Sequence, residues 1–178
     1  ALPEDMLRDM TDTADADPYK TVRPGVDPDD MVALQDMLAQ AKKPLMIVGG
    51  GGWDQKACDD IVAYAEANNL SCAASFRCQD LFDNNHPNYV GELGTSVSNA
   101  LSKHLLLVVG ARLGEMTTKG YSIVQVPRPK QKIIHVYPDP DEIGRVYQAD
   151  LAIAAGVDKF AAAARKSKPV AAPNWSDW

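Results

Sequence analysis

Short, fully apolar runs alternate with amphipathic stretches through the middle of the chain. The apolar runs predict six strands, at residues 45–48, 71–75, 89–90, 105–109, 133–136 and 151–153. Apolar residues at helical spacing predict helices that begin after Asp27, end at Asn68 and Asn69, lie within residues 95–102, and extend over residues 157–164. Asp27 before Pro28 is a typical helix start, because aspartate caps the free N–H groups and proline fits the first turn.

Strands that lack an apolar–polar alternation are typical of a parallel sheet buried on both faces. Interleaved with amphipathic helices, they predict an α/β fold: a three-layer α/β/α, Rossmann-like domain with a six-stranded parallel sheet in the order 3-2-1-4-5-6. We expect this domain to span residues 27–167. Residues 1–26, which are rich in proline and aspartate, and residues 168–178 are expected to be linkers.

Composition excludes several classes of protein. The 178 residues carry 18 basic and 24 acidic side chains, a net charge of −6, which argues against a nucleic-acid partner. The longest apolar runs are too short to cross a membrane, and no secretory signal is visible. The three cysteines form no CxxC pair, and their odd number predicts reduced thiols in a cytoplasmic setting and no zinc site.

The expected ligand position is the gap between the first and fourth strands, where the strand order reverses. Four glycines, 49–52, follow the first strand, and residues 110–114, which include Arg112, follow the fourth. The glycines either let a phosphate or nucleotide approach the backbone or serve only tight packing, and Arg112 either binds the same anion or forms a surface ion pair. The spacing does not match GxGxxG, because Asp54 and Gln55 stand where its last glycine would be.

The loop after the fifth strand has two interpretations. Asp139, Pro140 and Glu142 have the spacing of a capping box, which predicts a one-turn helix ending at Gly144. Alternatively, this loop borders the adenosine part of a nucleotide. The histidines have no partner in a recognisable motif and no GxSxG sequence occurs, so neither catalytic residues nor metal ligands are predicted in this chain.

Five short motifs occur in a fixed order, at residues 43–51, 75–77, 86–91, 109–113 and 135–144. Together they resemble the central domain of thiamine-diphosphate-dependent enzymes of the acetolactate synthase group. Residues 1–7 are similar to the segment that leaves the family's N-terminal pyrimidine-binding domain. Glu92 stands where acetolactate synthases have methionine, so nucleotide binding and a purely structural role both remain open.

The resemblance implies a three-domain enzyme for 2-keto acid decarboxylation followed by carboligation or release. Thiamine diphosphate and magnesium would be bound by N- and C-terminal domains, and the Gly-Asp-Gly motif of the latter does not occur here. This chain alone is therefore expected to be inactive, with those domains as its partners and a homodimer or homotetramer as the assembly. A free-standing NAD-type nucleotide-binding enzyme and a non-catalytic assembly module are the alternatives.

The resemblance also implies a cofactor position, because family members bind FAD, an adenine nucleotide such as ADP, or nothing in this domain. Matching motif positions place Gly50, Gly51 and Arg112 against the pyrophosphate or ribityl chain. By the same matching, Ser75, Phe76 and Arg77 lie near the flavin and Asp139 lies near the adenosine.

Overall fold

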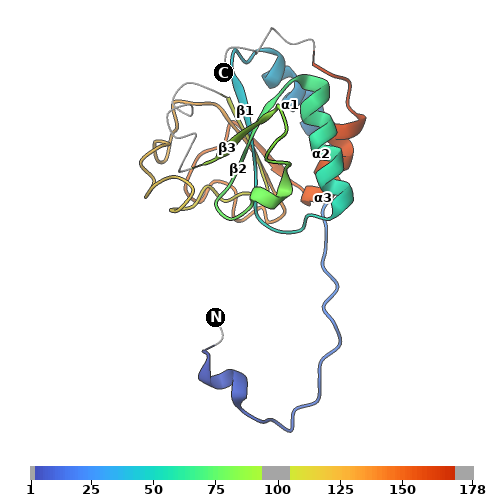
Figure 1. Ribbon diagram of the computed structural model, residues 1–178, viewed down its shortest axis with the longest axis vertical. Coiled ribbons are helices and arrows are strands. Elements are labelled where there is room, and N and C mark those ends of the chain that lie inside the picture. The colour runs from blue at the N-terminus through green and yellow to red at the C-terminus, as the bar shows by residue number, and fades with distance from the viewer. Residues whose placement is uncertain (1–2, 94–104, 171–178) are drawn as a thin grey trace.

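The computed structural model describes residues 3–93 and 105–170 and contains one parallel sheet with helices (Figure 1). The helical elements are η1 (Asp5–Arg8), α1 (Pro28–Ala39), α2 (Gln55–Asn68), η2 (Gln79–Leu81) and α3 (Val157–Lys166). The strands are β1 (Pro44–Val48), β2 (Ser71–Ala74), β3 (Tyr89–Glu92), β4 (Leu105–Val109), β5 (Ile133–Tyr137) and β6 (Leu151–Ala154). The helix predicted within residues 95–102 lies outside the described residues.

The six strands are all parallel and lie in the order β3-β2-β1-β4-β5-β6, which confirms the predicted topology. β1 is central: Val48 pairs with Ala74 of β2 on one side and with Val109 of β4 on the other. Every residue of β1 and β4 is buried, as the unbroken apolar runs predict. The carboxyl ends of these strands therefore meet at one edge of the sheet, which we call the carboxyl edge.

Local signals set the helix boundaries. Asp27 accepts a hydrogen bond of 2.9 Å from the N–H of Asp29 and begins α1, and Asp54 accepts one of 2.8 Å from Ala57 and begins α2. α2 ends where Asn69 takes a left-handed conformation with φ of +48°, which confirms the predicted stop. The predicted one-turn helix after Asp139 is absent: residues 140–144 form turns.

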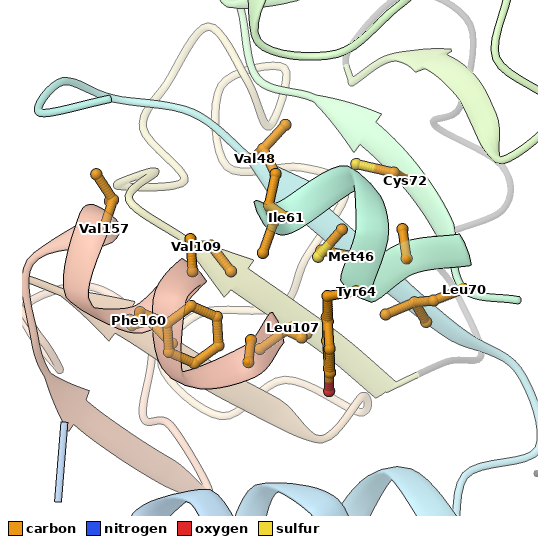
Figure 2. Packing of buried hydrophobic residues seen from close by; sticks show 14 of the residues in the cluster. Met46, Val48, Ile61, Tyr64, Leu70, Cys72, Leu107, Val109, Val157 and Phe160 are labelled. Carbon is orange, nitrogen blue, oxygen red and sulfur yellow. The ribbon is translucent and has the colours of Figure 1, made fainter. Parts of the chain in front are cut away.

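The larger hydrophobic cluster lies between the sheet and the three α-helices (Figure 2). Phe160 of α3 and Ile61 of α2 pack with Leu107 of β4, and all three are fully buried. Burying such a side chain contributes about 1.5–3 kcal/mol. Figure 1 shows α2 and α3 side by side, and residues 3–22 extending away from the domain. Arg23 and Pro24 already contact the domain, through Asp158 and the N–H of Gly156. No helix in the described ranges is long and apolar enough to cross a membrane.

The opposite face of the sheet carries a second cluster, which includes Ile47 and Val108. Two irregular connections contribute to it: residues 111–131, between β4 and β5, supply Leu113 and Val124, and residues 138–150, between β5 and β6, supply Tyr147. These connections run from the carboxyl edge back to the start of the next parallel strand. Side chains on both faces are therefore buried, as the predicted three layers require.

Candidate functional site

The turns after β1 and β4 meet at the carboxyl edge, where the sequence predicts a ligand site. The N–H of Gly49 donates a hydrogen bond of 3.1 Å to the carbonyl oxygen of Val109. A Cβ atom added at Gly50 would strike the carbonyl oxygen of Gly110, far inside the 3.0 Å limit that real Cβ atoms keep. The predicted neighbourhood of the two turns is thus confirmed.

Close packing accounts for two glycines of the run, Gly49 and Gly50, and for Gly110 in the second turn. Gly50 and Gly110 have φ of +70° and +75°, a region that glycine adopts without steric cost. A Cβ at Gly49 would lie 2.5 Å from the Cβ of Ser75. Gly51 differs, because a Cβ there would meet nothing within 4 Å. Tight packing therefore explains Gly49, Gly50 and Gly110, whereas Gly51 faces open space and Gly52 has room for a Cβ but a φ of +88°.

Two neighbouring residues change what the glycine turn offers to an anion. The Trp53 indole is half-buried, and its Nε1–H donates a hydrogen bond of 2.9 Å to the carbonyl oxygen of Gly49. Asp54 places a carboxylate at the start of α2, where it accepts the Ala57 N–H. The N-terminus of α2 thus already has an anionic partner.

Arg112 projects from the second turn and is held by β5 and the loop after it. Its Nε donates a hydrogen bond of 2.9 Å to the hydroxyl of Tyr137, and the guanidinium lies 5.8 Å from the centre of that ring. Glu142 is 3.9 Å away and also accepts from Arg145 at 3.2 Å. The hydrogen bond to Tyr137 and the nearby Glu142 carboxylate raise the pKa of Arg112. Arg112 is exposed and charged, but Glu142 offsets part of that charge.

The remaining predicted residues lie on the same edge with partners of their own. The buried Ser75 hydroxyl is 3.1 Å from the Thr117 hydroxyl. Arg77, at φ of +61°, stacks 5.3 Å above the Phe76 ring, and its N–H lies 3.4 Å from a Glu92 carboxylate oxygen. The structure therefore gathers these residues at one edge.

Asp139 lies in the loop after β5 at this edge. Its carboxylate accepts a hydrogen bond of 3.0 Å from the N–H of Asp141. This contact stabilises the local turn and leaves Asp139 exposed.

Sequence reasoning missed three residues that shape this edge. Tyr137 orients Arg112, Thr117 contacts Ser75, and Asp54 occupies the start of α2. Asp54 had a visible signal, since aspartate before a helix is a common cap. Tyr137 and Thr117 act across long sequence separations that no local pattern reveals.

Groups associated with catalysis are buried or dispersed. His135 donates a hydrogen bond of 2.9 Å from Nε2 to the carbonyl oxygen of Ala111, and burial lowers its pKa despite that bond and the nearby Glu142. All three cysteines are free, and burial raises the pKa of the Cys72 thiol. Within residues 3–93 and 105–170, no group of three His, Cys, Asp or Glu side chains has metal-binding geometry.

Comparison with known proteins identifies relatives of the whole domain. The family model described as thiamine pyrophosphate enzyme, central domain, matches residues 31–164. An acetolactate synthase large subunit of Parasynechococcus marenigrum is 33% identical over 69% of this chain and 20% of that protein. A sulfoacetaldehyde acetyltransferase of Rhodobacter capsulatus is 29% identical over 86% of this chain and 27% of that protein.

A solved structure shares the fold. Benzoylformate decarboxylase from Polynucleobacter necessarius superposes with a TM-score of 0.64 at 21% identity, over 93% of this chain and 32% of that one. The chain therefore spans roughly a fifth to a third of the length of the proteins it matches.

Proposed function

The chain belongs to the thiamine pyrophosphate enzymes as their central domain, and we propose that it is the structural centre of a larger thiamine-diphosphate-dependent enzyme acting on 2-keto acids. That enzyme would decarboxylate the keto acid and then either join the product to a second carbonyl compound or release it. Thiamine diphosphate, with magnesium, supplies the stabilised carbanion chemistry when bound. The domains that hold it, and a homodimeric or homotetrameric assembly, belong to the same proposal.

One observation carries the structural role: the two turns at the carboxyl edge close on each other. Gly50 meets Gly110 backbone to backbone, and Trp53 bonds to the Gly49 carbonyl. Ligand-binding glycine loops need an exposed backbone, whereas Gly49 and Gly50 pack closely against their own chain and leave Gly51 as the open position. This arrangement supports a domain that contributes packing and rigid positioning.

The test uses the protein that contains this domain together with its thiamine-binding domains. We expect it to release CO2 from at least one 2-keto acid, with activity lost when thiamine diphosphate is removed and restored when it is returned. The 178-residue chain alone serves as the control and is expected to release none. A protein that turns over no 2-keto acid in the presence of thiamine diphosphate and magnesium would refute the proposal and favour an assembly module.

A second candidate function is binding of FAD or ADP at the carboxyl edge. Open space at Gly51, the exposed Arg112 guanidinium and the nearby Asp139 favour it. The fit to a pyrophosphate is partial, because the Asp54 carboxylate occupies the start of α2 and Glu142 shares Arg112. Any such ligand would lie outside the glycine turn, along Gly51 and Arg112.

Titration of the chain with FAD, ADP and NAD tests this second function. A ligand present at about a hundred times its Kd stabilises the fold by about 2.7 kcal/mol, which a thermal melt resolves. We expect Arg112→Ala to abolish the stabilisation and Arg165→Ala, an exposed arginine of α3, to preserve it. Unchanged melting with all three nucleotides would leave the purely structural role.

A further inference from the structure

A cavity of about 920 Å³ lies on the second face of the sheet, away from the glycine turns. Its walls come from the two irregular connections: Tyr121, Ile123 and Val126 from residues 111–131, and Arg145 and Val146 from residues 138–150. Lys130, just before β5, contributes to the same lining. The volume is at the upper end of the roughly 300–1,000 Å³ that is typical of small-molecule sites.

Among the described residues, the cavity lining includes two cationic side chains and no carboxylate, in a chain whose net charge is −6. Lys130 has no acidic partner in the part of the chain that the structure describes. Arg145 shares one Nη1 contact of 3.2 Å with Glu142, which leaves further N–H groups of its fork for a ligand. Lys130 and Arg145 therefore favour an anion here.

Apolar surface forms the rest of the walls. Ile123 and Val146 are half-buried against the second hydrophobic cluster, and the Tyr121 ring and Val126 are partly exposed. A bare inorganic ion would leave this apolar surface in contact with water. A ligand with both a charged group and an apolar body would cover it, at a gain of about 25 cal/mol per Å².

The backbone around Tyr121 has an unusual conformation that a hydrogen bond within the loop holds in place. Lys119, Gly120 and Tyr121 have consecutive φ values of +49°, +64° and +60°. The Thr118 hydroxyl accepts a hydrogen bond of 3.2 Å from the Tyr121 N–H, and Thr118 is itself buried. Non-glycine residues in this conformation are strained, and such strain clusters at functional sites.

We propose that this cavity binds a small organic anion, a phosphate or carboxylate carried on an apolar or aromatic body. Lys130 and Arg145 contact the charged group, and Ile123, Val126 and Val146 contact the body. The site lies away from the glycine turns, although Glu142 links its Arg145 to Arg112 of the carboxyl edge. The proposal does not depend on thiamine chemistry. Its failure would leave the proposed enzyme function untouched.

The experiment titrates the isotopically labelled 178-residue chain with four probes and follows amide chemical shifts. Phenyl phosphate and benzoate combine charge with an aromatic body, inorganic phosphate has charge alone, and benzyl alcohol has the body alone. We expect saturable shifts at residues 121–126 and 145–146 with either or both aromatic anions. The tighter of the two identifies the preferred charged group.

Matched variants remove one positive charge each. Lys130→Gln removes a charge-assisted hydrogen bond to the ligand, so we expect it to weaken binding at least about tenfold. Lys166→Gln, on the exposed end of α3, is expected to change the Kd less than about twofold. The proposal is wrong if neither aromatic anion binds with a Kd below about 10 mM, a limit that corresponds to a binding free energy of under about 3 kcal/mol. It is equally wrong if either control probe binds as tightly or if Lys130→Gln binds normally.

Discussion

Replacing Gly50 by alanine tests whether backbone packing explains the glycine turn. Gly50 has φ of +70°, and an alanine costs about 1–2 kcal/mol in that region. Its Cβ would also overlap the carbonyl oxygen of Gly110, which cannot rotate away as a flexible side chain can. Overpacking of this kind typically costs about 1–3 kcal/mol. The sum predicts a loss of about 2–5 kcal/mol in the free energy of unfolding.

Gly51→Ala is the matched control, because it makes the same chemical change one residue away. A Cβ at Gly51 meets nothing within 4 Å, and this glycine has no left-handed φ. We expect a change within about 0.5 kcal/mol, or a gain of up to about 1 kcal/mol from a less flexible unfolded chain.

Urea unfolding followed by circular dichroism gives the free energy of unfolding of both variants, and thermal unfolding gives Tm. For a chain of this size, a loss of about 3 kcal/mol lowers Tm by about 6–12 °C, which separates the pair clearly. Equal stability of Gly50→Ala and Gly51→Ala would show that the contact with Gly110 does not constrain the turn. Packing against Gly110 would then not explain why residue 50 is a glycine.

Three further predictions use separate parts of the domain. Asp54→Ala removes the cap of α2 and should lower the free energy of unfolding by about 1 kcal/mol in the same urea assay. Ellman's reagent should modify two thiols of the folded chain and reach the third, Cys72, only on unfolding; rapid reaction of all three would contradict its burial. Because burial lowers the pKa of His135 below 6.5, the unfolded chain binds a proton that the folded chain excludes, and stability should fall as pH drops below about 6.5. His135→Gln should flatten that pH dependence, and an unchanged slope would assign it to other groups.

The sheet was predictable because each strand carries its own signal. Residues 105–109 contain five consecutive apolar side chains, and all are buried in β4. The order of the strands follows from parallel pairing and right-handed connections, which leave few alternatives. Helix ends at Asp27 and Asn69 were also readable, since both depend on the residue type at one position.

The chemistry of the carboxyl edge was less predictable, because it depends on contacts between distant segments. The sequence places Arg112 at this edge but does not show that Tyr137, 25 residues later, holds it. It shows four glycines but not that Gly50 meets Gly110. The cavity near Lys130 was missed for the same reason, since its walls come from two connections that have no regular periodicity.

The space at each glycine and the pairing of each cationic side chain together distinguish a packed turn from a ligand site in this domain. A glycine run after the first strand permits two kinds of close approach, by the chain's own backbone or by a ligand, and glycine content cannot separate them. The space available for an added Cβ atom does separate them, because a Cβ at Gly50 would overlap Gly110 whereas a Cβ at Gly51 would meet nothing within 4 Å. Charge gives the second half of the criterion: Glu142 offsets Arg112 at the carboxyl edge, whereas Lys130 stays uncompensated among the described residues. The open backbone at Gly51 and the uncompensated charge of Lys130 occur in different places in this domain. A nucleotide titration should therefore perturb Gly51, and an aromatic-anion titration should perturb Lys130, whereas Arg112 and Arg145 are linked by Glu142.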